Sequence, residues 1–336
     1  MPASVPRASE GPASEGPASD LSEVVDRARR LDKVAVAHLV SRFEDTRPAA
    51  VADRAEVMEA LADREPGAVV GVTGTPGSGK STLIARLTHD LLADDPGLTL
   101  AVLAIDPSSA VSGGALLGDR TRLRGGHGGE RLFFRSQASA TELGGLSPSA
   151  FQVVRLLARL FDAVLVETVG IGQSEADIRH LADRVYLVLQ PLGGDEVQFL
   201  KAGIIEIPDR FVLNKSDEPA AETSYHHLKG SLGLARPFDE ELPPVFRTSA
   251  RTGDGVADLV VALRDDIAAH RRGHEREAER EGYFLARWVD DEWGRQGRTH
   301  LHAALGGPGA LLDEAGDFDA AQQHFDRSVR AALGRA

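Results

Sequence analysis

The stretch GVTGTPGSGKSTL, which spans Gly71–Leu83, decides the fold of this chain. From Gly74 to Ser81 it fits the P-loop template of a glycine, four variable residues, glycine, lysine and a hydroxyl residue. An apolar, β-rich run at 68–73 precedes the loop, and a helical pattern at 81–92 follows it. An ordinary glycine turn is the alternative, but it requires neither the lysine nor the hydroxyl in register after a strand. The stretch therefore predicts a binding site for a nucleoside triphosphate.

Each part of the motif has an expected role. The glycines allow backbone N–H groups to close around the phosphates at the N-terminus of the following helix. Lys80 is expected to reach the β- and γ-phosphates, and Ser81 to ligate Mg²⁺. The expected nucleotide contacts in this loop are Gly74, Pro76, Gly77, Ser78, Gly79, Lys80, Ser81 and Thr82.

The composition argues against several classes of protein. The chain has 336 residues, 42% of them apolar, so it can bury a sizeable core. A formal net charge of −13 argues against a nucleic-acid-binding protein, which needs a concentrated basic face. The absence of cysteine excludes disulfides, thiolate metal ligands and a cysteine nucleophile. The sequence shows neither a signal-peptide pattern nor an apolar run of membrane length, so we expect a soluble, cytoplasmic protein with no membrane partner.

Composition also divides the chain into four regions. Residues 1–20 are rich in Pro, Ala, Ser, Gly and Glu, and predict a disordered tail. Residues 21–66 predict a helical extension in two pieces, separated near Pro48. Residues 67–272 carry the P-loop and predict the nucleotide-binding domain. Residues 273–336 predict a helical arm whose apolar stripes must pack on the body of the protein, on a second copy or on a partner.

Short apolar runs alternate with helical patterns throughout the nucleotide-binding domain. The runs lie at 68–73, 98–105, 131–135, 163–169, 184–190, 210–214 and 244–249. Nearly continuous apolar strands joined by helices are typical of a parallel sheet covered on both faces. The sequence therefore predicts an α/β fold of the P-loop type, with a mostly parallel central sheet. Ligands of such sheets bind at the carboxyl ends of the strands, where every motif of this chain falls.

A second motif indicates which base is bound. Asn214, Lys215, Ser216 and Asp217 follow a strand and fit the Asn-Lys-x-Asp pattern of GTPases. Asp217 is expected to accept hydrogen bonds from guanine N1–H and the 2-amino group, a pair that adenine does not offer. Asn214 is expected to tie this loop to the P-loop, and the Lys215 stem to cover one face of the base. The Ser249-Ala250 pair, after the last strand, is expected to contact guanine through its backbone. These residues favour GTP over ATP.

Two acidic residues at strand ends are candidates for the metal site. Glu167 begins an ExxG motif that ends at Gly170, where a carboxylate can hold Mg²⁺ through water and a glycine N–H can sense the γ-phosphate. Gln173 lies three positions beyond that glycine, and we assign it no role in orienting water. Asp106 could help to hold the hydration shell of the metal or orient water; a helix cap or an Asp-Pro turn is the alternative.

Together these motifs resemble one family. The segments AIDPSSAVSGGALLGDRTR (104–122), ETVGIGQSE (167–175) and GDEVQFLKAGIIE (194–206), with the P-loop and NKSD, are similar to those of the MeaB/ArgK-type GTPases. These are P-loop GTPases of the SIMIBI class that act as chaperones for adenosylcobalamin-dependent acyl-CoA mutases, typically methylmalonyl-CoA mutase. The resemblance covers residues 20–300.

The resemblance implies further roles. It implies a GTP/GDP-binding enzyme, for which we expect a catalytic set made of Lys80, Asp106 and Glu167. We expect slow intrinsic turnover, because the sequence places no arginine finger or water-orienting glutamine. The resemblance places Ser81, Asp106, Asp119 and Glu167 around Mg²⁺. It makes 119–122 and 170–175 the two switches, and 192–203, with Lys201, a third loop that meets the mutase. It also implies a homodimer formed through the C-terminal arm.

Two other functions remain open from the sequence. A P-loop small-molecule kinase would share the phosphate loop, but it gives no reason for NKSD or ExxG. A nickel metallochaperone GTPase belongs to the same class, but such proteins use cysteine and histidine near the switches, and the histidines of this chain are scattered.

Overall fold

The computed structural model describes residues 21–106, 129–138, 146, 148–168, 174–191, 204–237, 241–270 and 277–334. The strands are β1 Ala68–Gly74, β2 Leu100–Asp106, β3 Leu132–Ala138, β4 Ala163–Thr168, β5 Arg184–Leu189, β6 Arg210–Leu213 and β7 Val245–Arg247. The helices are α1 Leu21–Arg29, α2 Lys33–Glu44, α3 Pro48–Ala60, α4 Lys80–Asp94, α5 Pro148–Leu160, α6 Ser174–Leu181, α8 Ala221–Ala235, α9 Val256–His270, α10 Glu277–Leu305, α11 Pro308–Ala315 and α12 Phe318–Ala332. Short 3₁₀ turns occur at Gly129–Arg131 and Ile204–Glu206.

The strands form one parallel sheet in the order β3-β2-β4-β1-β5-β6-β7. Every predicted apolar run forms a strand, and the predicted α/β fold is confirmed. All residues of β1 and β4 are buried, because helices cover both faces. The register aligns Val72 with Glu167 and Leu189 with Leu213, so the strands end at one common edge.

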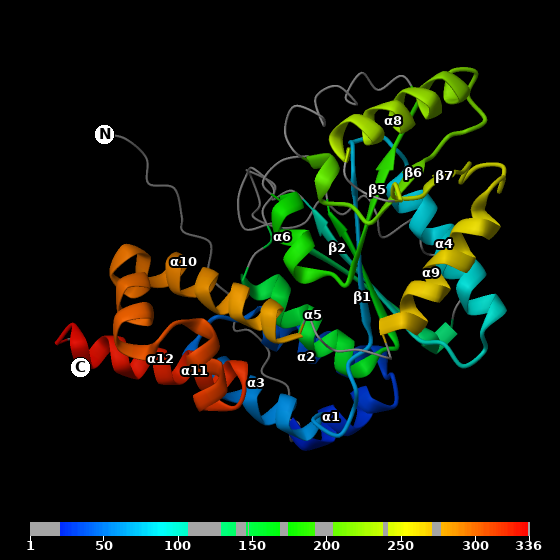
Figure 1. Cartoon of the computed structure of the whole chain (residues 1–336). Helices are drawn as coiled ribbons and strands as arrows, with labels where there is room; N and C mark the ends of the chain where they lie inside the picture. The colour runs from blue at the N-terminus through cyan, green and yellow to red at the C-terminus, as the bar shows by residue number, and fades with distance from the viewer. Residues whose placement is uncertain are drawn as a thin grey trace, which may run out of the picture.

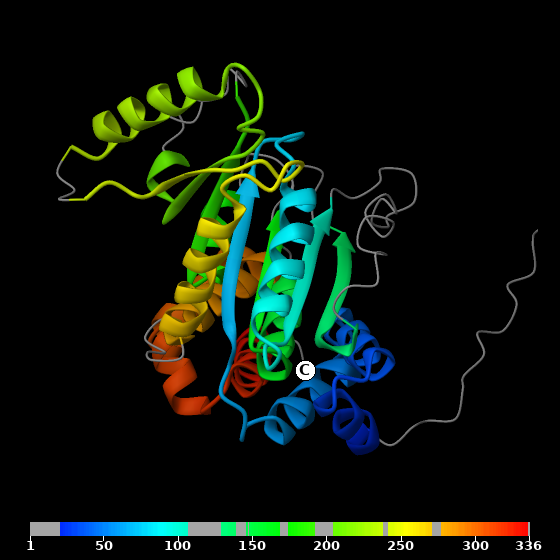
Figure 2. The same cartoon turned by 90° about the vertical axis from the view of Figure 1, so that its right-hand side faces the viewer.

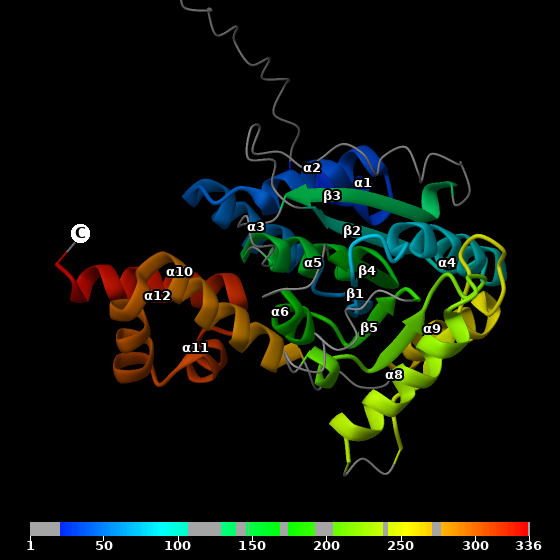
Figure 3. The ribbon, with the colours of Figure 1, turned by 90° about the horizontal axis from the view of Figure 1, so that it is seen from above.

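The two faces of the sheet are covered differently (Figures 1 and 2). On one face, α4 and α9 pack on the central strands through a core that includes Leu87, Leu91 and Leu263. On the other face, α5 and α6 cover the strands, and the N- and C-terminal helices pack outside them, as the view from above shows (Figure 3). Because this second core is continuous from the sheet to the terminal helices, the helical extension and arm belong to the folded body.

The N-terminal helices differ from the sequence prediction in one respect. The predicted break near Pro48 is present, since α3 begins at that residue. The preceding segment, however, is two helices and not one. Leu31 adopts a left-handed φ of 63°, and Asp32 then caps α2 by accepting hydrogen bonds from the backbone N–H groups of Val34 and Ala35. An aspartate cap at the start of a helix stabilises the new helix locally.

The C-terminal helices pack on the body of the protein. Phe284 of α10 stacks on Phe151 of α5 with ring centroids 4.4 Å apart, and Phe318 of α12 meets the same ring edge-on at 5.0 Å. Gly294 interrupts α10 with a non-helical conformation, which kinks the helix. The chain then continues into α11 and α12, which lie beside α10 (Figure 1). The apolar stripes of the C-terminal helices thus pack on the body of the protein, and dimerisation through the arm stays a prediction. No helix in the described part of the chain has the length and apolar character needed to cross a membrane.

Candidate nucleotide-binding site

The P-loop joins β1 to α4 at the carboxyl edge of the sheet, and two of its glycines have no substitute. Gly74 has a φ of 144°, and a Cβ there would lie 2.0 Å from the carbonyl oxygen of Val188 on β5. Gly79 has a φ of 85° and stands at the N-cap of α4. Without side chains, the backbone can turn tightly and present the N–H groups at the start of α4 to an anion.

Lys80 is held against the same loop. Its ammonium donates hydrogen bonds to the carbonyl oxygens of Gly74 at 2.8 Å and Thr75 at 3.0 Å, and its side chain is buried. The positive charge therefore lies beside the N–H groups of the helix N-terminus, where a phosphate would be attracted by both.

Ser81 and Glu167 meet at the start of α4. The Ser81 hydroxyl donates a 2.7 Å hydrogen bond to Oε1 of Glu167, although the two residues are 86 positions apart. Both side chains offer hard oxygen donors, the type that Mg²⁺ prefers, so the pair fits a magnesium ion. The backbone of Asp106 ends β2 at the same edge, one residue beyond Ile105, which pairs with Thr168 of β4. The side chain of Asp106 lies outside the described residues, as do Asp119, Gln173 and Lys201. The predicted loops 119–122 and 192–203, and residues 170–173 of the predicted switch 170–175, also lie outside them.

Asn214 links three loops of the site. This side chain is only 1% exposed. Its Nδ2 donates to the carbonyl oxygen of Ser78 in the P-loop at 2.8 Å, and its Oδ1 accepts from the N–H of Ala250 at 3.1 Å. The Thr248 hydroxyl lies 3.4 Å from the same oxygen. The expected link between this loop and the P-loop is therefore present. It also explains Gly79, because a Cβ there would lie 2.6 Å from the Asn214 amide nitrogen.

Asp217 is oriented by the loop that follows β7. The Ser249 hydroxyl donates to Asp217 Oδ1 at 2.5 Å, and Arg251 forms an ion pair with Oδ2. The hydrogen bond from Ser249, and then the one from Arg251, hold the pKa of the Asp217 carboxyl below its usual range. The carboxylate thus stays ionised and is a strong acceptor for two N–H groups. The sequence predicted backbone contacts for Ser249, and it gave no signal for the role of its side chain.

Lys215 adopts a strained backbone conformation. Its φ of 59° is in the left-handed region, which costs a residue with a side chain about 1–2 kcal/mol. Its ammonium donates a 2.7 Å hydrogen bond to Oε1 of Gln190, the residue that directly follows β5. No motif in the sequence drew attention to Gln190.

A second polar cluster joins α6 to α10. Asp177 on α6 is 5% exposed, accepts a 2.8 Å hydrogen bond from the Tyr283 hydroxyl and forms an ion pair with Arg287. Burial, and then the bond to Asp177, raise the pKa of Tyr283 to about 12. His180 stacks on the Tyr283 ring with centroids 3.7 Å apart, and burial lowers the pKa of this histidine. The cluster fastens the helix that follows the ExxG segment to the C-terminal arm.

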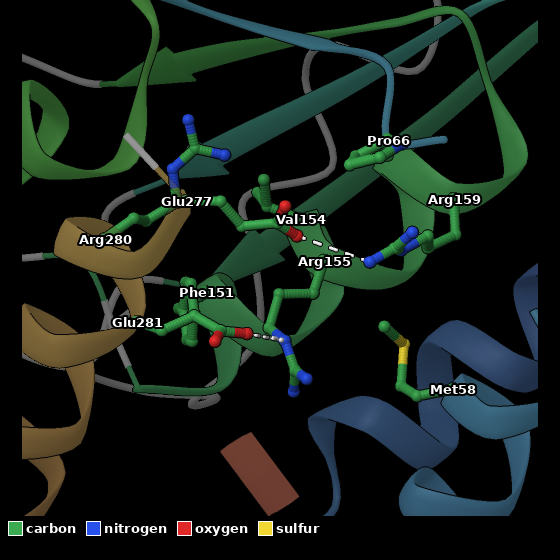
Figure 4. Close-up of a pocket in the computed structure, with 10 residues that line it drawn as sticks. Met58, Pro66, Phe151, Val154, Arg155, Arg159, Glu277, Arg280 and Glu281 are labelled. Carbon is green, nitrogen blue, oxygen red and sulfur yellow. Dashed lines mark hydrogen bonds and ion pairs between the residues drawn. The ribbon is translucent and has the colours of Figure 1, made fainter. Parts of the chain in front are cut away.

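A small cavity between α3, α5 and α10 is separate from this site (Figure 4). Its volume is about 30 Å³, room for about one water molecule, so a nucleotide does not fit. Arg155 and Glu281 line it with a 3.5 Å ion pair, and Arg159 and Glu277 with one of 3.3 Å. Pro66, which precedes β1, places the cavity at the opposite end of that strand from the P-loop. Among the described residues, no cluster of three or more His, Cys, Asp and Glu forms a candidate metal site.

The parallel sheet and a P-loop tied to an Asn-Lys-x-Asp loop place this chain among the P-loop GTPases. Comparison with known proteins gives the family: the family model described as methylmalonyl Co-A mutase-associated GTPase MeaB matches residues 36–296, and the chain belongs to this family. The GTPase ArgK of Escherichia coli is 34% identical over 251 residues, which cover 73% of this chain and 75% of ArgK. The mouse protein named methylmalonic aciduria type A homolog, mitochondrial, is 38% identical over 201 residues, 58% of this chain and 48% of that protein.

A solved structure shares the fold. The structure of a LAO/AO transport system kinase superimposes with a TM-score of 0.63 and 24% identity, covering 94% of this chain and 97% of that one. Because the comparison extends over nearly the whole chain, the helices at both ends belong to the shared architecture. The chain is therefore a GTPase of the MeaB family, and the kinase interpretation is set aside.

Proposed function

We propose that this GTPase is a chaperone for an adenosylcobalamin-dependent acyl-CoA mutase such as methylmalonyl-CoA mutase, assisting cofactor loading or protection. The description of its family and the name of its mouse relative support this role. The observation that carries the GTP-dependent part of the proposal is the Asn214 link, because it joins the phosphate loop to a loop able to select guanine. A homodimer formed through the C-terminal arm, and a cytoplasmic location, are parts of the same proposal.

The proposed reaction is in-line attack of water on the γ-phosphate of GTP. Lys80 and the N–H groups at the start of α4 stabilise the negative charge on the phosphates. Ser81 and Glu167 would hold Mg²⁺, and Asp106 and Asp119 would complete its site. The ion, when bound, would supply neutralisation of the phosphate charge.

The base is selected at the other side of the site. Asp217, held ionised by Ser249 and Arg251, accepts hydrogen bonds from the guanine N1–H and 2-amino groups. The Lys215 stem covers one face of the base, and the Ser249-Ala250 backbone contacts its edge. Replacing Asp217 by asparagine is expected to shift the preference from GTP toward xanthosine triphosphate. Xanthine carries an acceptor oxygen at the position of the guanine 2-amino group, and the asparagine amide can donate to it. Unchanged GTP selectivity in this variant would remove the base assignment.

Intrinsic turnover is expected to be slow, since Ile171 follows Gly170 where a switch GTPase of the Ras type carries glutamine. The test measures GTP hydrolysis by the purified protein alone and with a cobalamin-dependent acyl-CoA mutase, with the Lys80→Ala variant as control. We expect stimulation by the mutase and no hydrolysis by the variant. Fast unstimulated turnover, or the lack of any effect of the mutase on GTP hydrolysis or nucleotide affinity, would contradict the proposal.

A further inference from the structure

The side chain of Lys215 runs along the carboxyl edge of the sheet between two neighbouring strands. Leu189 of β5 and Leu213 of β6 are partners in register, so the next residues, Gln190 and Asn214, occupy equivalent positions at this edge. Lys215 follows Asn214, and its ammonium reaches back to Oε1 of Gln190 at 2.7 Å. The stem therefore spans the gap between the end of β6 and the end of β5.

The backbone of Lys215 is held independently of its side chain. Its carbonyl oxygen accepts a 3.0 Å hydrogen bond from the N–H of Glu218, and the next N–H, that of Ser216, donates to the Thr248 carbonyl at 2.9 Å. The left-handed φ of Lys215 sets the direction in which its side chain leaves the loop. With the backbone fixed at one end and the ammonium at the other, the four-carbon stem has little freedom left.

We propose that Gln190 is a positioning residue for the guanine base, acting through Lys215. A lysine stem without a fixed end samples many rotamers, and the cost of ordering it on binding weakens the affinity. The hydrogen bond to Gln190, here called the tether, orders the stem before the ligand binds. Gln190 can do this as a neutral amide, which fixes the ammonium without cancelling its charge beside an anionic ligand. The inference rests on the proposed guanine site, and it adds a residue that neither the P-loop nor the NKSD motif contains.

The proposal has a signature that separates it from base reading by Asp217. The stem covers the face of the purine ring and does not contact its exocyclic groups. Loss of the tether should therefore weaken GDP and IDP equally, since inosine differs from guanosine only in lacking the 2-amino group. Loss of the Asp217 carboxylate should instead change the ratio of the two affinities.

The test measures the dissociation constants of GDP and IDP for the full chain by isothermal titration. Gln190→Leu, which keeps the size but loses the acceptor, should weaken both nucleotides by about 3- to 10-fold, because the ligand must then order one long side chain when it binds. Gln190→Glu keeps an acceptor oxygen and should stay closer to the wild-type affinity. In the Lys215→Ala background, Gln190→Leu should have no further effect. Gln296→Leu, the same substitution at an exposed glutamine on α10, is the matched control and should bind both nucleotides as the wild type does.

Two results would overturn the inference. One is wild-type GDP affinity in a folded Gln190→Leu variant, with thermal unfolding as the check on folding. The other is an unchanged effect of Gln190→Leu when Lys215 is already alanine. Failure of the proposed guanine site gives a different result, because the wild type would then bind ADP, titrated in the same way, as tightly as GDP.

Discussion

Replacing Asn214 by alanine tests whether the candidate site is built as the structure indicates. The side chain is buried and joins the P-loop, its own loop and the loop after β7. Alanine leaves the Ser78 carbonyl oxygen and the Ala250 N–H without this partner, and also removes the weaker contact with Thr248. The expected consequences are a less stable protein and a weaker hold on nucleotide.

The magnitude follows from the groups left behind. A buried polar group that loses its partner costs about 1–3 kcal/mol, and the Ser78 and Ala250 groups are the two strongly bonded ones. We therefore expect the free energy of unfolding to fall by about 2–4 kcal/mol. About 1–2 kcal/mol of this loss comes from the broken contact with the P-loop. In the variant, part of the binding energy of GDP must be used to bring the two loops together, so we expect GDP to bind about tenfold more weakly.

The assays are urea unfolding and GDP titration of the wild type, Asn214→Ala and Asn214→Asp. Aspartate keeps an acceptor for the Ala250 N–H, but it places a negative oxygen against the Ser78 carbonyl. Because the position is buried and its contacts in the described part of the chain include no cation, aspartate should lower the free energy of unfolding at least as much as alanine does, and it should weaken nucleotide binding as well. If Asn214→Ala bound GDP as tightly as the wild type, the link between the two loops would not hold the site together, and the reasoning would be wrong.

Two further predictions concern the contact between α6 and α10. Asp177→Ala should lower the free energy of unfolding by about 2–4 kcal/mol, because it leaves the partly buried Arg287 without its main partner. The control is Asp291→Ala, at the exposed carboxylate 3.8 Å from the same arginine, which should lower it by under about 0.5 kcal/mol. Equal losses in urea unfolding would refute the view that Asp177 is the main partner of Arg287. Burial lowers the pKa of His180 from 6.5, so the unfolded state takes up this proton at a higher pH and stability should decrease as pH falls below 6.5. His180→Phe keeps the stack on Tyr283 and should remove that part of the pH dependence; urea unfolding between pH 7.5 and 5 measures it, and an identical profile in the variant would contradict it.

Much of the fold could be predicted because its signals are local. A buried strand in a parallel sheet is a short apolar run, and each run of this kind forms a strand. The P-loop and the NKSD tetrapeptide are also local, since their residues are near neighbours in the chain. The break after α1 was missed because it depends on the left-handed conformation of Leu31, and nothing in a leucine indicates that conformation.

Contacts between distant residues could not be predicted in the same way. Gln190 is 25 positions from Lys215, and Asp177 is 106 from Tyr283. A glutamine after a strand and an aspartate in a helix are common, and their partners are known only when the strands and helices are placed in space.

The sequence by itself determined the phosphate loop, the strands and the family, because backbone conformation and the P-loop depend on residues next to one another. The tertiary structure alone decided what surrounds them: the glutamine that holds Lys215, the serine hydroxyl that orients Asp217, and the packing of the C-terminal helices on α5. These contacts depend on strand order and register, which bring together side chains that no local pattern relates.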